Sequence, residues 1–525
     1  MVSKIIKFSL LAILTISTCD ALRFLVFFPL YSKSHAILGQ AMVTKLLDAG
    51  HEVVHVTTFP RDKPVANLTE VNLVTPVEWL KIQDDEKKLD IFKLKSLVGK
   101  ESFGNSYTFI HFNFVLQKIS LEDPDLIKLL KDPKQKFDAV ILEWCFADMI
   151  AGIAPLFRSP LIWFGSLEAD WQTLKLVDEI PNPSYNVDVF SNHRPPLSFG
   201  ERVNELYSLI KKLAIYGAII TPHEKAVYND LFPKIAAARG VSMPSYEEAV
   251  YNGSFLLLNS HPSMGTPFKL PQNAKYIAGY HIDANLKNLM DGAKDGVIYF
   301  SMGTSLKSID MTDYMRNSLL DMFSKLKQTV IWKYEGDLDK VPKNVHLFKF
   351  VPQQSVLAHP NLKFFITHGG QLSTTEAVHF GVPVIGIPVL CDQYVNMLAV
   401  TNKGWGIIIH LAENMAYDIS VAIEEMLGNS SYKARAKEIS AIYHDRQQLP
   451  GEELVYWIEY VVRTKGAPHL KSLALTLPFY KKLYIDLISI ILFVLITIVF
   501  IIRKLIYSDV SNNKTIGKGR KEKRH

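Results

Sequence analysis

Residues 350–393 read FVPQQSVLAHPNLKFFITHGGQLSTTEAVHFGVPVIGIPVLCDQ and form the most informative segment of the chain. The apolar run 363–367 predicts a buried strand, and the two glycines after His368 predict a sharp turn into a helix that begins near Gln371. The free amides and the positive end of the helix dipole would face the end of the strand and attract an anion. The segment therefore predicts a phosphate site built from a strand, a turn and a helix.

Polar side chains follow this turn at positions that suit a nucleotide sugar. His368 and Ser373 could donate hydrogen bonds to a phosphate, and Glu376, one helical turn further, could hold both hydroxyls of a ribose. Asp392 and Gln393 follow the next predicted strand, and an acidic and an amide side chain side by side suit sugar hydroxyls. Because ligands of such sheets bind beyond the carboxyl ends of the strands, we expect these side chains to share one site.

Strands and helices alternate on both sides of this segment. Apolar runs predict strands at residues 22–28, 51–58, 137–143 and 160–164 in the first half, and at 296–300, 329–334, 345–350 and 382–387 in the second. The stretches from about 90 to 130 and from about 165 to 245 are expected to be helical or irregular. This alternation predicts an α/β protein with two parallel sheets, helices over their faces and a ligand in the cleft between two domains.

Length, composition and charge exclude several classes of protein. The 525 residues predict two or three domains. The apolar content of 48 % and the charged content of 21 % exclude an extensively disordered, collagen-like or coiled-coil protein, and three cysteines exclude a disulfide scaffold. The net charge is +6, and the eight basic and two acidic residues from Arg503 to His525 account for all of it. The rest of the chain is neutral overall, so nothing indicates nucleic-acid binding.

The two ends of the chain predict a membrane protein of the secretory pathway. A basic start, a short apolar core and small residues before position 22 predict a signal peptide over residues 1–21. The uncharged run Leu487–Ile502 predicts one transmembrane helix over residues 484–504, with Arg503 and Lys504 at its cytosolic end. Residues 505–525 would form a basic cytosolic tail, in which Lys521 and Lys523 match a dilysine retrieval signal. Sequons at Asn67, Asn252 and Asn429 would be luminal and permit glycosylation, which would make the chain a glycoprotein.

The 350–393 segment resembles the signature of the UDP-glycosyltransferases of glycosyltransferase family 1. The shared pattern is an aromatic-x-Pro-Gln start, an apolar strand, His-Gly-Gly, a Glu one helical turn on, Gly-x-Pro and Asp-Gln. The resemblance extends over nearly the whole chain, and the ends match the animal, endoplasmic-reticulum branch. The His-Gly-Gly-x-Leu-Ser-Thr-Thr-Glu sequence is similar to that of the arthropod members. It implies a GT-B fold, with an N-terminal acceptor-binding domain over 22–285 and a C-terminal UDP-sugar-binding domain over 286–470.

The resemblance also implies roles for individual residues. Phe350 would stack on the uracil, where Trp is usual, so we expect weaker binding or looser base choice. Glu376 would hold the ribose, and Asp392 with Gln393 would hold the sugar. The remaining donor contacts would come from Ser301, Gly303, Thr304, Val351, Gln353, His368, Gly370 and Ser373.

The N-terminal half should supply the acceptor site and a general base. His35 follows the first predicted strand, and the family pattern places a base histidine in this loop. Such a histidine needs a carboxylate that orients it and stabilises the imidazolium. Glu143 at the end of a predicted strand and Asp148 at the start of the next helix are both candidates, and Asp148 is slightly favoured.

The implied reaction is sugar transfer with inversion at the anomeric carbon. No cofactor and no metal are expected, because helix amides and His368 would meet the diphosphate charge, and Asp123-Pro124-Asp125 suits a loop or helix start better than a metal motif. Expected partners are a UDP-sugar, a small lipophilic acceptor with a hydroxyl, as in detoxification, and the bilayer; a homo-oligomer is compatible with the sequence. Glucose is the expected sugar by analogy with arthropod members, although the side chains do not separate it from glucuronic acid.

Three other classes of protein fit the sequence less well. A catalytically degenerate, membrane-anchored binding protein would have lost His35 or Asp392, and both are present. A UDP-sugar epimerase is expected in the cytosol, which the two ends of the chain contradict. A single-span receptor or lectin does not need the intact phosphate site. The predicted location is the endoplasmic-reticulum membrane, in single-pass type I orientation with luminal catalytic domains.

Overall fold

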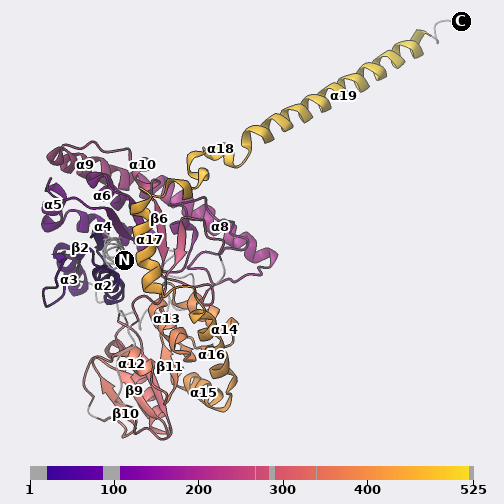
Figure 1. Cartoon of the computed structure of the whole chain (residues 1–525). Coiled ribbons are helices and arrows are strands. Elements are labelled where there is room, and N and C mark those ends of the chain that lie inside the picture. Colours follow the sequence, from indigo (N-terminus) through magenta and orange to yellow (C-terminus); the bar gives the residue numbers. More distant parts are fainter. Residues whose placement is uncertain are drawn as a thin grey trace, which may run out of the picture. The chain divides into compact units, whose positions relative to one another are not determined.

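The structure is a computed structural model that describes residues 21–86, 107–265, 268–282, 290–304, 306–338 and 340–519 (Figure 1). The predicted signal peptide, apart from Ala21, and the two lysines of the predicted retrieval signal lie outside the described residues. The chain forms two compact units, of which the first ends at Lys471 and the second begins at Ser472. All the elements of the predicted site belong to the first unit.

The N-terminal half of the first unit is built on a parallel sheet of seven described strands. Its strand order is β3-β2-β1-β4-β5-β6-β7. Strands β1, β4 and β5 are almost completely buried, as expected for the centre of a parallel sheet with helices on both faces. The bounds are β1 Arg23–Phe28, β2 Glu52–Thr57, β3 Leu68–Asn72, β4 Ala139–Trp144, β5 Leu161–Gly165, β6 Phe255–Leu258 and β7 Ala274–Tyr276.

Helices connect these strands and cover the sheet. Asp123 caps α5, where its side chain accepts a hydrogen bond from the amide of Asp125, so this motif is a helix start as expected. The helices are α2 Lys33–Asp48, α3 Thr75–Glu86, α4 Tyr107–Leu121, α5 Pro124–Lys131, α6 Ile153–Phe157, α7 Trp171–Leu174, α8 Phe199–Ile215, α9 Thr221–Arg239 and α10 Tyr246–Val250.

The C-terminal half repeats this architecture with a parallel sheet of six described strands. Its strand order is β10-β9-β8-β11-β12-β13. The strands are β8 Val297–Ser301, β9 Thr329–Lys333, β10 Val345–Phe348, β11 Leu362–Thr367, β12 Val384–Gly386 and β13 Gly406–Ile408. The helices are α11 Asp313–Ser324, α12 Gln353–Leu357, α13 Gln371–Phe380, α14 Gln393–Asn402, α15 Met415–Gly428 and α16 Ser431–His444.

The last helix of the first unit returns to the N-terminal sheet. Helix α17, Pro450–Arg463, lies beside β6 in Figure 1, and its Trp457 stacks on Phe255 with ring centroids 4.9 Å apart. Leu454 and Ile458 are fully buried in the core around β1. Residues up to 470 were expected in the C-terminal domain, but this helix packs with the N-terminal half because its apolar face completes that core.

The second unit contains the apolar segment predicted to span a membrane. Helix α18 covers Phe479–Lys482, and α19 runs over Ile485–Gly519. Within α19, the 23 residues Ile485–Tyr507 are long and apolar enough to cross a bilayer. The helix extends beyond the predicted end at 504 because Leu505, Ile506 and Tyr507 continue the apolar stretch past two basic residues.

Candidate active site

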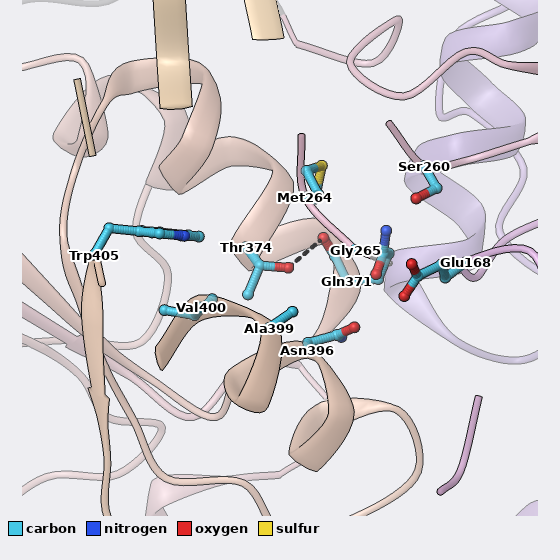
Figure 2. Close-up of a pocket in the computed structure, with 10 residues that line it drawn as sticks. All are labelled: Glu168, Ser260, Met264, Gly265, Gln371, Thr374, Asn396, Ala399, Val400 and Trp405. Atoms are coloured by element: carbon cyan, nitrogen blue, oxygen red, sulfur yellow. Dashed lines mark hydrogen bonds between the residues drawn. The ribbon is translucent and has the colours of Figure 1, made fainter. Parts of the chain in front are cut away.

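A pocket lies between the two halves of the first unit (Figure 2). Its empty volume is about 280 Å³, counting the solvent at its mouth. Glu168 and Ser260 line it from the N-terminal half, and Gln371 and Asn396 line it from α13 and α14. None of the residues predicted to bind the donor or to act in catalysis lines this pocket. The predicted residues gather instead beyond the carboxyl ends of the two sheets.

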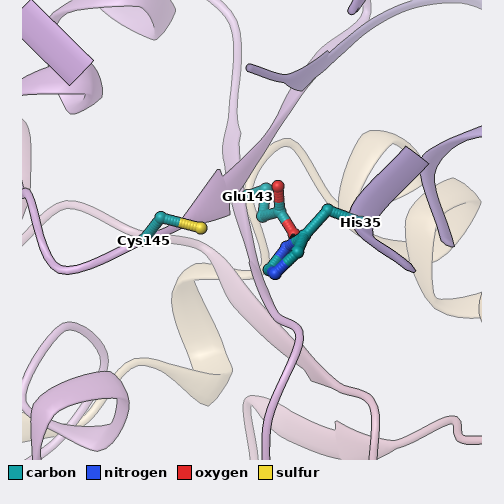
Figure 3. A group of neighbouring side chains, drawn as sticks. All are labelled: His35, Glu143 and Cys145. Atoms are coloured by element: carbon teal, nitrogen blue, oxygen red, sulfur yellow. Dashed lines mark hydrogen bonds and ion pairs between the residues drawn. The ribbon is translucent and has the colours of Figure 1, made fainter. Parts of the chain in front are cut away.

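His35 and Glu143 form a close pair at the edge of the N-terminal sheet (Figure 3). Strand β4 pairs with β1 in parallel, with Leu142 opposite Phe27, so Glu143 lies level with the end of β1. The chain then turns into α2, whose first turn carries His35. His35 Nδ1 lies 2.5 Å from Glu143 Oε1. The neighbouring strands therefore bring the predicted base to a carboxylate.

The electrostatic surroundings make His35 a stronger base. Burial alone would lower its pKa, but the charge and hydrogen bond of Glu143, together with the charge of Asp392, raise the pKa above the usual value. Glu143 is fully buried, whereas the His35 side chain keeps 23 % of its surface exposed. The imidazole can thus be reached by a substrate while its partner carboxylate is shielded from water.

Two loops of the C-terminal half form the predicted phosphate site. In the parallel pairing of β11 with β8, Thr367 lies opposite Ser301, so the loops that follow these strands are neighbours. The hydroxyl of Ser301 accepts a hydrogen bond from the Gly303 amide at 3.2 Å. Helix α13 begins at Gln371, directly after the glycine turn. Its N-terminal amides therefore face the end of the sheet, where an anion would bind.

Glycine is required at the turn after β8 because of the His368 ring. Gly303 has a φ of +86°, and a Cβ atom there would lie 2.4 Å from His368 Cε1. A Cβ atom on Gly370 would lie 2.6 Å from His368 Nε2. The imidazole therefore packs against two glycine positions, one in each loop, and locks the loops together.

The residues predicted to bind the uridine are an exposed aromatic ring and a network of side-chain hydrogen bonds. Phe350 is 76 % exposed, as a stacking platform requires. Gln353 donates to Glu376 Oε2 at 2.6 Å and contacts Ser373 Oγ at 3.3 Å, while Gln354 donates to Glu376 Oε1 at 3.0 Å. The Glu376 carboxylate is thus held in place by two glutamines. Of the other predicted donor contacts, Val351 is buried and Thr304 is exposed.

The predicted sugar contacts lie at the start of α14. Asp392 Oδ2 accepts hydrogen bonds from Asn396 at 2.6 Å and from the Gln371 amide at 3.2 Å. Burial raises the pKa of Asp392, while these hydrogen bonds and the charge of His35 oppose the rise. Gln393 Oε1 accepts from the amide of Val389 at 2.9 Å, which fixes the loop before the helix. His35 and Asp392 each shift the pKa of the other, so these side chains of the two halves lie near one another.

Comparison with known proteins decides the family. The family model described as UDP-glucoronosyl and UDP-glucosyl transferase matches residues 25–522. This chain belongs to the UDP-glycosyltransferase family. It is 30 % identical to UDP-glucosyltransferase 2 of Dactylopius coccus, with 93 % of each chain covered. It is 28 % identical to UDP-glucuronosyltransferase 2B15 of Rattus norvegicus, over 69 % of this chain and 68 % of the rat protein.

Solved structures confirm the fold of this UDP-glycosyltransferase. A UDP-glucosyltransferase from Polygonum tinctorium, capable of glucosylating indoxyl, superposes with a TM-score of 0.53 at 14 % identity. The match covers 85 % of this chain and all of the plant protein. The predicted GT-B fold with two parallel sheets is confirmed, and the chain is a glycosyltransferase that transfers a sugar from a UDP-sugar to an acceptor.

Asp148 of this UDP-glycosyltransferase is engaged away from His35. Its carboxylate lies 2.6 Å from Lys175 Nζ and accepts a hydrogen bond from the Trp144 indole at 2.8 Å. The slight preference for Asp148 as the partner of His35 is therefore corrected, because the structure places Glu143 there. Asp148 joins a buried network of the N-terminal half that also includes Glu224, which accepts from the Asp148 amide at 3.1 Å.

A third side chain that can ligate metals lies beside the His35–Glu143 pair of this UDP-glycosyltransferase. The ligand atoms of His35, Glu143 and Cys145 lie within 4.8 Å of one another (Figure 3). Burial and the charge of Glu143 raise the pKa of the Cys145 thiol well above its usual value.

Lys333 is a further charged residue at the predicted phosphate loops, and it was not among the residues predicted from the sequence. Its Nζ donates to the carbonyl of Gly303 at 2.7 Å and lies 2.7 Å from Glu335 Oε1. Burial and the charge of Lys333 lower the pKa of His368 to about 4, so this imidazole is neutral at physiological pH. Its position at the end of β9, beyond which ligands bind in such sheets, was the available indication in the sequence.

Proposed function

We propose that this UDP-glycosyltransferase transfers glucose from UDP-glucose to a hydroxyl of a small lipophilic acceptor, with inversion at the anomeric carbon. The observation that carries the proposal is the His35–Glu143 pair, which lies within electrostatic reach of Asp392 on the opposite half. A base and a sugar-binding carboxylate at one site are what a direct displacement requires. The acceptor would approach from the His35 side and the donor from the Asp392 side.

The proposed step follows from the hydrogen bonding of His35. The Nδ1–H of the neutral ring donates to Glu143, so Nε2 is left to accept the proton of the acceptor hydroxyl. The acceptor oxygen then forms a bond to the anomeric carbon while the bond to the UDP oxygen breaks. Glu143 stays anionic and stabilises the imidazolium.

The leaving diphosphate would be stabilised by charges that the protein supplies. The amides at the start of α13 and the ammonium of Lys333 surround the loops after β8 and β11. We propose that these groups suffice for departure of UDP and that the reaction needs no added metal. Chelation with EDTA should then leave the rate unchanged.

Support for the donor and the acceptor comes from different observations. The Dactylopius relative is a UDP-glucosyltransferase by name and matches more of the chain than the rat UDP-glucuronosyltransferase does. For the acceptor, Tyr31 and Phe59 stack with ring centroids 4.9 Å apart in the loops that follow β1 and β2. Tyr31 is 41 % exposed and lies four residues before His35, so it offers an aromatic surface to a lipophilic molecule.

The proposed location is the endoplasmic-reticulum membrane, with the first unit in the lumen. It is supported by the apolar segment Ile485–Tyr507 and by the predicted signal peptide and basic tail. Glycosidase-sensitive modification at Asn252 or Asn429 in intact membranes would agree with this orientation. This orientation would be contradicted if the sequons were unmodified and protease cleaved the first unit in sealed vesicles.

The test is a donor comparison on membranes that contain the full chain. UDP-glucose, UDP-glucuronic acid, UDP-galactose and UDP-N-acetylglucosamine are each offered with a set of lipophilic phenols and alcohols. We expect a β-glucoside from UDP-glucose and none from a His35→Ala variant that still binds UDP. Preferential use of another sugar would overturn the glucose assignment, and an α-glucoside would overturn inversion. Product formation by His35→Ala at the wild-type rate would overturn the role of His35.

A further inference from the structure

Helix α8 exposes an apolar face along its whole length. Six side chains on this face are between 38 % and 75 % exposed: Phe199, Val203, Leu206, Tyr207, Ile210 and Leu213. They recur at spacings of three and four residues, so they form one continuous stripe on the helix. At 1.5 Å per residue, the 17-residue helix makes this stripe about 25 Å long.

The opposite face of α8 carries buried charges that fix its orientation. Lys212 is 3 % exposed, and its Nζ lies 2.5 Å from Asp188 Oδ2. Glu205 is 5 % exposed, and its Oε1 lies 2.7 Å from His193 Nδ1. Turning the apolar stripe inward would expose these partners or leave them buried without a counter-charge, which is costly. The helix is therefore inverted relative to an ordinary surface helix, with charges inside and apolar side chains outside.

A continuous apolar stripe of this size needs something to cover it. Soluble monomers rarely expose contiguous apolar patches above a few hundred Å². The helical turn Tyr216–Ile220 that follows adds one more exposed apolar side chain, Ile219, which is 36 % exposed. Arg202 and Lys211 are exposed beside the stripe, and the guanidinium of Arg202 lies over the Phe199 ring at 5.9 Å. Apolar and aromatic side chains with long cations beside them are the composition of a helix that lies in a membrane interface.

We propose that the exposed face of α8 lies on the surface of the lipid bilayer. The chain itself supplies the reason for choosing this occupant. The connection between Lys471, where the first unit ends, and Ile485, where the apolar segment begins, has 13 residues and spans at most about 45 Å when extended. A first unit tethered this closely meets the bilayer at high effective concentration, so even a weak contact would be occupied. The proposal rests on the proposed membrane anchoring and goes beyond the proposed reaction.

The experiment uses the full chain in phosphatidylcholine vesicles. Leu206→Cys and Ile210→Cys are labelled with the fluorophore NBD, and quenching by doxyl-labelled phosphatidylcholine is measured. Asp230→Cys on α9, where the side chain is 74 % exposed, is the matched control on the same half. Ser489→Cys in α19 reports insertion of the apolar segment, and the unsubstituted chain corrects for labelling of its own cysteines. UDP binding by each labelled variant confirms that it is folded.

We expect doxyl lipid to reduce the emission at positions 206 and 210 about twofold and to leave position 230 nearly unchanged. Equal, small quenching at 206, 210 and 230 overturns the proposal, whatever position 489 shows. Emission at 206 and 210 that is blue-shifted but insensitive to doxyl lipid also overturns it, because protein would then cover the face, either a second copy or another segment of this chain. Glycoside formation is measured separately, so a failure of the proposed function and a failure of this contact can be told apart.

Discussion

His35 Nδ1 lies 2.5 Å from the fully buried carboxylate of Glu143. The two residues are 108 positions apart, and they meet because β1 and β4 are neighbours in a parallel sheet. The contact with Glu143 orients the imidazole and raises its pKa, while the ring keeps 23 % of its surface exposed. This relationship is the basis of the proposed reaction and of the first prediction.

The rate should rise with pH as His35 loses its proton. Burial lowers the pKa of His35, but Glu143 and Asp392 outweigh it, so the pKa lies above the usual 6.5. As the pH rises through this raised pKa, kcat/KM should increase to a plateau. In Glu143→Gln the main cause of the raised pKa is gone, so the rising limb should move to lower pH while the plateau falls. The measurement is the pH profile of kcat/KM for both proteins. An unmoved limb would show that Glu143 does not set the basicity of His35.

Phe350 should contribute to donor binding through its ring. Stacking of a base on an aromatic side chain is worth about 1–3 kcal/mol, so Phe350→Ala should weaken UDP binding about tenfold or more. Phe350→Trp should tighten it, because the larger ring covers more of the base. Calorimetry with UDP measures both, and Tyr417→Ala is the control, since that ring is similarly exposed at 72 %. Equal affinity in all four proteins would remove Phe350 from the site.

Lys333 should matter for the diphosphate. Its ammonium lies 2.7 Å from the Gly303 carbonyl, next to the proposed phosphate loops, so Lys333→Met should raise the KM for the UDP-sugar about tenfold. Lys325→Met, which removes an exposed lysine on the surface of the same half, should change it less than about twofold. Steady-state kinetics at low and moderate salt give both values. If the two variants behave alike, Lys333 has no part in donor binding.

Gly303→Ala should damage donor binding more than stability. Both Gly303 and Gly50 have a φ near +87°, so an alanine at either position costs about 1 kcal/mol of folding free energy. A methyl group at 303 would also displace the His368 ring, whereas none of the described residues lies within 4 Å of a methyl group at position 50. We therefore expect Gly303→Ala to melt somewhat below Gly50→Ala, and a loss of UDP affinity only in Gly303→Ala. Wild-type affinity in that variant would show that the loop does not need this packing.

The sequence predicted the elements whose signals are local. Continuous apolar runs gave the central strands of both sheets, and the 350–393 segment placed the turn before α13 correctly. Strands β3, β7 and β13 were missed because they lie at sheet edges and are only partly buried, so no continuous apolar run marks them. Strand β6 is a short apolar run that was not assigned. The packing of α17 on the first sheet was also missed, since an apolar helix face does not indicate which sheet it covers.

The candidate site shows the same division between local and distant information. The order of residues around His368 is a local pattern, and the structure brings those residues together. The choice between Glu143 and Asp148 depends on Lys175, which is 27 positions from Asp148 and neutralises it in a buried ion pair. No spacing rule within the 143–148 segment contains that information, so only the tertiary structure separates the two carboxylates.

The most direct measurement of the central claim is the turnover of Glu143→Gln and Asp148→Asn, each normalised to the UDP-binding sites in the sample. Glu143→Gln should lose about 10²-fold or more in kcat while still binding UDP, because His35 loses its anionic partner. Asp148→Asn should be less stable, since Lys175 loses its counter-charge, but each folded molecule should turn over within about tenfold of wild type. The opposite result, with turnover retained in Glu143→Gln and lost in folded Asp148→Asn, would contradict the assignment of Glu143 as the partner of the catalytic base.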